Sequence, residues 1–362
     1  MVLSTTLVFS YTGGDDVPED ITEVHVRKGV KSIWDYAFED CKQLEHIKIP
    51  PTVKFIGEYA FRYCESLTNI DLSTTSIKEI PKQAFCGCRS LGSISLPSTI
   101  ESIGDQAFAA CESLTDIDLP SSIVYIGYEA FGYCKSLTSL TLPPNLASIE
   151  KELMWGCQSF TSITIPDSIT TIRNNAFNAC YSLTSITLPT SLDTIGESVF
   201  SSCTGLISIF LPSNIRVIGQ SAFAYCLSIT SITIPPKTVV IEGYTFIRCS
   251  SLSSVSLPPT IRSIKSRAFG RCYSLDSITI PIETQIEVGS FEEKTNVIRS
   301  NWWLLYQCIK VRELVASGRA AVRQEEVERR DLGIVHEFIV NTCDDIFRTV
   351  LEMAKDKSVV KV

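Results

Sequence analysis

The sequence predicts a repeat solenoid, in which short turns of chain stack on one another. Cysteine recurs every 23 residues, with one interval of 24. Phenylalanine stands three residues before each of these cysteines, except at Met154, and proline stands nine residues after them, except at Ser73. Self-similarity at a fixed period of roughly 20–50 residues is typical of stacked repeats. The repeat cysteines are Cys41, Cys64, Cys88, Cys111, Cys134, Cys157, Cys180, Cys203, Cys226, Cys249 and Cys272.

Composition narrows the class of protein. The 362 residues are 44% hydrophobic and 20% charged, with a net charge of −8, which favours a folded chain over a disordered one. An acidic balance argues against a nucleic-acid partner. No apolar run approaches the roughly 18 residues that a membrane span needs. We therefore expect no nucleic-acid binding and no membrane span.

Each part of the repeat has an expected conformation. The segment I-T-L-P alternates at period two and ends at proline, which predicts a β-strand. The following I-x-x-I-G predicts a second, shorter strand or bend, and its glycine, present in only five turns (Gly57 among them), suggests left-handed geometry that is tolerated but not obligatory. The segment A-F-x-x-C predicts one helical or 3₁₀ turn. Residues 7–11 predict a strand and residues 12–16 a turn, in preference to a secretory signal, because no basic residue precedes the apolar stretch.

The unit A-F-x-x-C-x-S-L-x-x-I-x-L-P resembles the BspA-type (Treponema-like) leucine-rich repeat, whose core L-x-x-I-x-L appears at residues 67–72. The resemblance implies a right-handed solenoid with parallel β-strands. It also implies binding, because members of the family act as adhesins, surface receptors and interaction scaffolds. It carries over no catalytic residues. We divide the chain into an N-terminal cap (residues 1–17), a solenoid of about eleven or twelve turns (18–291) and a C-terminal cap (292–362).

The column of cysteines has two interpretations. Metal or redox chemistry is disfavoured because C-x-x-C spacing is absent and only three histidines are available. Small apolar filler in a buried stack is the simpler interpretation. A reduced column favours an intracellular, cytoplasmic location, and we expect no cofactor and no metal.

Outward positions of the main strand form a nearly uncharged row of hydroxyl groups, interrupted by acidic residues and one phenylalanine. Such a row stabilises a sheet by itself, but it also suits a broad recognition face. Calcium binding by the acidic residues and templating of ordered water by the threonines are weaker alternatives. The candidate binding face comprises Asp116, Asp118, Thr141, Thr164, Thr187, Phe210 and Thr233.

After residue 291 the period changes. Residues 301–315 and the segment from Leu332 onward have apolar residues at helical spacing, which predicts an α-helical C-terminal segment. A cap over the last turn explains it, because a solenoid otherwise exposes a cross-section of its core. The alternative is a partner or homodimer contact through these helices.

No catalytic motif appears, and the sequence predicts that the chain is not an enzyme. The function expected is protein–protein interaction, as a scaffold that binds a macromolecule through the strand face. A secreted or cell-surface adhesin or receptor-like protein is the alternative.

Overall fold

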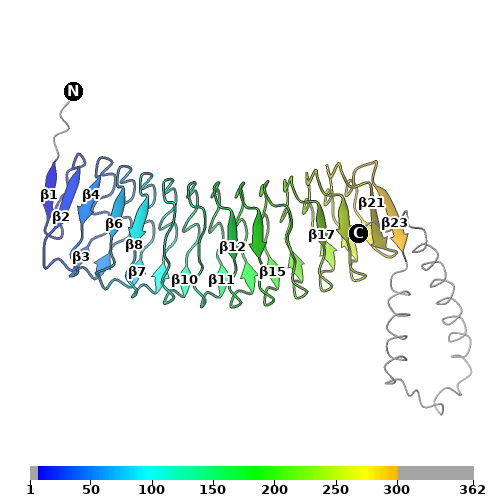
Figure 1. Ribbon diagram of the computed structural model, residues 1–362, viewed down its shortest axis with the longest axis horizontal. Coiled ribbons are helices and arrows are strands. Elements are labelled where there is room, and N and C mark those ends of the chain that lie inside the picture. Colours follow the sequence, from blue (N-terminus) through cyan, green and yellow to red (C-terminus); the bar gives the residue numbers. More distant parts are fainter. Residues whose placement is uncertain (1–6, 301–362) are drawn as a thin grey trace, which may run out of the picture. The chain divides into compact units, whose positions relative to one another are not determined.

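A computed structural model describes residues 7–300 of the chain. The chain divides into two compact units, one comprising residues 1–279 and 284–298 and the other residues 280–283 and 299–362. The first unit is a solenoid of stacked turns, which Figure 1 shows from β1 to β21. The two helices predicted within residues 301–362 lie outside the described residues.

Two columns of short parallel strands build the solenoid (Figure 1). One column contains the longer strands and corresponds to the predicted I-T-L-P segment. Partners lie one repeat apart, as in Thr164 beside Thr187. These strands are β1 (Val8–Tyr11), β2 (Glu23–Val26), β4 (His46–Lys48), β6 (Asn69–Asp71), β8 (Ser93–Ser95), β12 (Ser162–Thr164), β14 (Ser185–Thr187), β17 (Ser231–Thr233), β19 (Ser254–Ser256), β21 (Ser277–Pro281) and β23 (Asn296–Ser300), the last of which pairs with β21.

The second column contains two-residue strands at the predicted I-x-x-I segment. In each pair the isoleucine or its equivalent aligns with that of the next turn, as Ile172 does with Ile195. The strands are β3 (Ser32–Ile33), β5 (Phe55–Ile56), β7 (Glu79–Ile80), β9 (Ser102–Ile103), β10 (Tyr125–Ile126), β11 (Ser148–Ile149), β13 (Thr171–Ile172), β15 (Thr194–Ile195), β16 (Val217–Ile218), β18 (Val240–Ile241), β20 (Ser263–Ile264) and β22 (Gln285–Ile286).

The expectation of a helical or 3₁₀ turn at A-F-x-x-C was wrong. The segment is a series of tight turns, and no helix of either kind occurs between residues 7 and 300. The residues five and one before each repeat cysteine have φ values of 51° to 62°, or 73° to 75° at the two glycines there, Gly87 and Gly156. A helix needs negative φ throughout, so this alternation excludes one. The reason for the wrong prediction is that Phe and Cys at i and i+3 share one side of such turns as they do of a helix.

These turns supply the main hydrogen bonds between repeats. In the turns of Cys41 to Cys249 the N–H groups five, three and one residues before the cysteine donate to carbonyls of the next turn. Glu152, Met154 and Gly156, for example, donate to Asn174, Ala176 and Asn178 at 3.0, 2.8 and 2.8 Å. Most of the intervening N–H groups bond within their own turn, as Leu153 and Trp155 do. The backbone is therefore satisfied by stacking, as buried polar groups require.

Columns of identical side chains fill the space between the strands. The phenylalanine rings stack with centroids 5.2–5.7 Å apart, interrupted at Met154. Tyr11 of β1, fully buried, lies 5.1 Å from Phe38 and covers the first ring. The predicted N-terminal strand thus completes the phenylalanine column at that end.

The glycine of I-x-x-I-G has a different role from the one predicted. Left-handed geometry does not occur at Gly57 or Gly104. A Cβ at Gly57 would instead lie 2.3 Å from the backbone nitrogen of Asp35, and one at Gly104 would lie 2.7 Å from that of Lys82. Close approach of the preceding turn therefore requires glycine at these positions.

The register can be tested at Ile172, which is fully buried in β13. Ile172→Asp places an unpaired carboxylate in the core, and we expect the free energy of unfolding to fall by on the order of 4 kcal/mol or more. Chemical denaturation followed by circular dichroism measures the change. Thr171→Asp, on the outward-facing neighbour, is the control and should have a small effect. Near-native stability of Ile172→Asp would contradict the assigned register.

The left-handed turns can be tested at Ala179, whose φ is 59°. Glycine adopts this conformation without the strain that Cβ imposes, so Ala179→Gly should leave the unfolding free energy unchanged or raise it by up to about 1 kcal/mol. Ala176, fully buried and outside the left-handed positions, is the control. Ala176→Gly should lower the stability by about 1 kcal/mol. Equal losses in the two variants would exclude the strain argument.

Candidate functional site

The strand face consists of the outward side chains five and seven residues after each repeat cysteine. All seven predicted binding residues are exposed on it. Thr164, Thr187 and Thr233 lie in strands β12, β14 and β17. The other four, Asp116, Asp118, Thr141 and Phe210, lie where the chain passes through the same column without strand pairing. The predicted strand is therefore interrupted in those turns, although the side chains still point outward.

The strand face is hollowed near its middle. A groove of about 560 Å³ brings together three of the predicted residues, Thr141, Thr164 and Thr187. Asp116, Asp118, Phe210 and Thr233 lie outside it. The remaining lining is formed by Ser139, Leu140, Leu142, Ser162, Ile163, Pro166 and Ser185.

Hydroxyl groups on this side of the solenoid fall into two classes. Four of those that stand four residues after a cysteine (Thr68, Thr161, Thr184 and Ser253) donate to a carbonyl of the preceding turn, as Thr161 and Thr184 do to the carbonyls of Thr138 and Thr161 at 3.2 Å. Thr164 and Thr187 instead donate no side-chain hydrogen bond to any other residue of the part described here. The hydroxyls of the groove are thus available to a partner, whereas their neighbours serve the fold.

Asp71 is separated from the other acidic residues of the strand face, Asp116 and Asp118, which lie two residues apart in one turn. Asp71 accepts a hydrogen bond from the N–H of Ser73 at 2.9 Å, and the side-chain and backbone hydrogen bonds of Ser73 lower the pKa of that carboxyl. Ser95 occupies the strand beside Asp71, so a turn intervenes before Asp118. Within residues 7–300 no group of three or more His, Cys, Asp or Glu residues is placed to hold a metal ion.

The cysteine column donates hydrogen bonds as well as filling space. From Cys64 to Cys272, each Sγ donates a hydrogen bond to a backbone carbonyl of the preceding turn, at 3.1–3.3 Å. The acceptor is the repeat phenylalanine of that turn, or Met154 where methionine replaces it. The carbonyl of Phe85, for example, accepts from Cys88 N–H and from Cys111 Sγ, both at 3.2 Å. Burial raises the pKa of these thiols, to about 12 for Cys180 and Cys226. A thiol held in this form is a poor nucleophile and a poor metal ligand.

Sequence reasoning missed a second surface, the turn columns, formed by the side chains five and one residues before each repeat cysteine. In the middle turns they form a polar chain in which Gln83 donates to Gln106 at 2.5 Å and Gln106 to Glu129 at 2.7 Å. Glu152 follows Glu129 in the same column and accepts from Tyr128 at 2.9 Å. Burial and this bond raise the pKa of Tyr128. Alignment of the turns would have revealed these columns.

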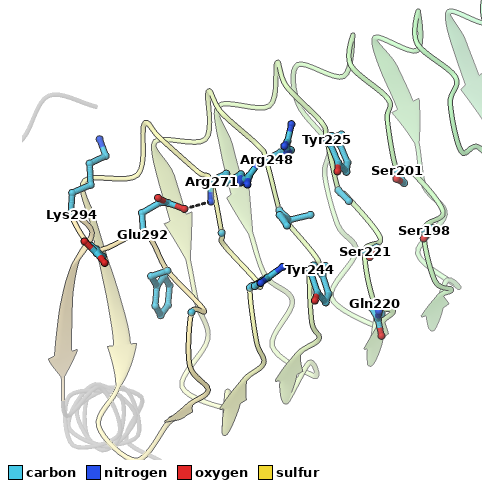
Figure 2. A pocket seen from close by; sticks show the side chains of 17 residues that line it. Ser198, Ser201, Gln220, Ser221, Tyr225, Tyr244, Arg248, Arg271, Glu292 and Lys294 are labelled. Carbon is cyan, nitrogen blue, oxygen red and sulfur yellow. Dashed lines mark hydrogen bonds between the residues drawn. The ribbon is translucent and has the colours of Figure 1, made fainter.

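At the C-terminal turns of the solenoid the turn columns border a larger cavity of about 1150 Å³ (Figure 2). Here the side chains change from acidic and amide groups to tyrosine and arginine. Arg248 lies over the Tyr225 ring with 5.3 Å between the guanidinium carbon and the ring centroid, and Arg267 lies over Tyr244 at 5.9 Å. Both contacts are within the range of cation–π attraction.

No helix within residues 7–300 is long and apolar enough to cross a membrane. Residues 18–137, 101–227 and 170–298 match the family described as BspA type leucine rich repeat region, in six copies. No curated protein matches the sequence.

Solved structures of bacterial leucine-rich repeat proteins resemble the chain. One from Bacteroides ovatus has a TM-score of 0.62 and 29% identity, and the match covers 82% of this chain and 84% of that one. One from Eubacterium ventriosum has a TM-score of 0.50 and 22% identity, covering 82% and 92%. The leucine-rich repeat protein of T. pallidum has 25% identity and a TM-score of 0.38, covering 51% and 78%.

The protonated cysteine column predicts a pattern of chemical labelling. Cys86 is the only partly exposed member of the twelve cysteines between residues 7 and 300. At pH 8 we expect iodoacetamide to modify Cys86 well before the repeat cysteines. Burial raises the pKa of all these thiols, that of Cys86 included, but only Cys86 is exposed enough for the reagent to reach it. Mass spectrometry of peptides measures each site separately, including Cys308 and Cys343 outside the described residues. Labelling of Cys134 or Cys157 in the native protein as fast as Cys86 would contradict the burial described here.

Proposed function

Because the chain belongs to the family of proteins with BspA-type leucine-rich repeats, we propose that it is a recognition protein whose strand face binds a macromolecular partner, most simply another protein. The family is typically non-catalytic, and its solenoids generally serve as binding scaffolds. The observation that carries the proposal is the strand-face groove lined by Thr141, Thr164 and Thr187. Its threonine hydroxyls are not used by the fold.

The chemistry of the strand face suits a partner with exposed backbone or amide groups. Hydroxyl side chains donate and accept hydrogen bonds, and Leu140, Leu142 and Ile163 add apolar contact in the groove. Phe210, with 79% of its surface exposed, lies on the same face and offers an aromatic anchor. The groove is lined by no charged side chain, so it recognises shape and hydrogen bonding and does not depend on charge.

We place this recognition at a cell surface or outside the cell, as the adhesin and receptor-like members of the family suggest. Twelve free cysteines favour the second candidate, an intracellular scaffold. That argument is weakened by the burial and raised pKa of the repeat thiols, which slow oxidation in any compartment. Biotinylation of intact cells that make the protein distinguishes the two locations.

The strand face can be tested with the triple variant Thr164→Arg, Thr187→Arg, Phe210→Arg. Three long charged side chains obstruct the groove and its flank, so we expect capture of the partner from native extract to fall at least about tenfold. Quantitative mass spectrometry of the captured proteins measures the change, after circular dichroism has confirmed folding.

A matched control places three arginines on the other strand column. Phe55, Tyr125 and Val217 are about half exposed in β5, β10 and β16. The variant Phe55→Arg, Tyr125→Arg, Val217→Arg adds the same charge and should capture the partner as the wild type does. If the strand-face variant binds normally, or both variants lose the partner equally, the strand face is not the recognition surface.

A further inference from the structure

The cavity at the C-terminal turns of the solenoid has the features of a second binding site, on a different surface from the strand face (Figure 2). It extends over five successive turns, from Ser198 to Lys294. Four intervals of about 4.8 Å make it roughly 19 Å long, which is the length of about six residues of extended chain at about 3.3 Å each. Its length therefore suits a short extended segment that runs along the solenoid axis.

Three arginines dominate one half of this cavity, although the chain as a whole carries a net charge of −8. Arg248, Arg267 and Arg271 occupy left-handed positions with φ of 61°, 55° and 61°. In the described residues their guanidinium groups form no ion pair. Arg173 and Arg216, elsewhere on the solenoid, are paired with Glu150 and Asp193 at 3.1 and 3.2 Å.

Arg248 and Arg267 are held in place without being neutralised. Tyr225 and Tyr244 support Arg248 and Arg267 from the preceding turn. On the following turn Gly289 has no side chain to cover Arg267, and a Cβ there would lie 3.9 Å from its Cγ. The nearby carboxylate of Glu292 accepts a hydrogen bond from the backbone N–H of Arg271, not from its guanidinium group (Figure 2). The guanidinium donors therefore remain available to carboxylates, which they bind in bidentate fashion.

The other half of the cavity is neutral. Ser198, Ser201, Gln220 and Ser221 line it, and their hydroxyl and amide groups match the amides of a peptide backbone. Glu292 and Glu293 lie at the opposite end, where they would repel a continuous polyanion; Lys294 beside them is paired with Asp276 at 3.3 Å. A ligand whose negative charges face the arginines and whose remaining part is uncharged fits this distribution better than a uniformly charged chain.

We propose that this cavity binds an acidic peptide segment in extended form, with two or three neighbouring Asp or Glu carboxylates paired to Arg248, Arg267 and Arg271 and uncharged residues over the serines and Gln220. The site is independent of the strand face. It gives the protein a second recognition surface, with a charge preference that the uncharged groove of the strand face does not have.

The test uses a fluorescent peptide, Ser-Gly-Ser-Glu-Glu-Glu, its reversed sequence, and the same peptides with Gln for Glu. Fluorescence anisotropy with the full chain at 50 mM salt should show one of the Glu peptides bound at least about tenfold tighter than its Gln analogue. Affinity should fall severalfold at 300 mM salt. The double variant Arg248→Gln, Arg271→Gln should weaken binding at least about tenfold.

Two controls make the result specific. Arg173→Gln with Arg216→Gln removes the same charge outside the cavity and should change affinity less than about twofold. The strand-face triple variant should bind the peptide as the wild type does. Absence of binding, equal affinity for Glu and Gln peptides, or equal losses in the two double variants would overturn the proposal. Tighter, arginine-dependent binding of heparin would also overturn it, because it would identify a site for continuous polyanions.

Discussion

Stacking of one turn on the next places every side chain of the solenoid, and the tight turns before each cysteine hold that stack together. From the turn of Cys41 to that of Cys249, three N–H groups per turn donate across to the next repeat, and from Cys64 onward the thiol donates back to the turn before. A backbone that bonds across repeats at a fixed spacing requires each turn to have the same length. The single inserted residue is accommodated near Thr75, buried with its hydroxyl bonded to the Leu72 carbonyl at 2.7 Å, away from the tight turns.

This constraint separates the residues that serve the fold from those free to serve function. Positions that point inward repeat with little variation, because each must pack against copies of itself. Positions that point outward form columns in which a change affects no core contact. A local change in an outward column, such as Phe210 among hydroxyl residues or Arg248 after Tyr225, is therefore more informative about binding than any residue of the repeat consensus.

The sequence was sufficient to predict the period, both strand columns, the N-terminal strand and the exposure of all seven candidate residues, because these depend on periodicity and side-chain alternation. It could not predict the tight turns, since Phe and Cys share a face in a helix as well. It also could not predict why Gly57 is a glycine, because the close approach of Asp35 arises only when turns stack. The groove at Thr164 and the cavity at Arg248 depend on how neighbouring columns combine across turns, and a single repeat does not encode that combination.

The left-handed positions connect the fold to the second surface. Glycine is the residue best suited to φ near 60°, yet it occupies these positions only at Gly87 and Gly156 in the eleven cysteine-containing turns. There the rings of Tyr63 and Tyr133 from the preceding turn cover it, within 2.4 and 2.8 Å of where a Cβ would lie. A non-glycine residue in this conformation lowers the stability of the fold by about 1 kcal/mol or more.

Large side chains persist at these positions because the turn directs them outward in register, where they stack on their counterparts. In the C-terminal turns that register places arginine on tyrosine and leaves the guanidinium donors unpaired. The left-handed conformation of the turn, despite its strain, thus aligns these charges for a ligand.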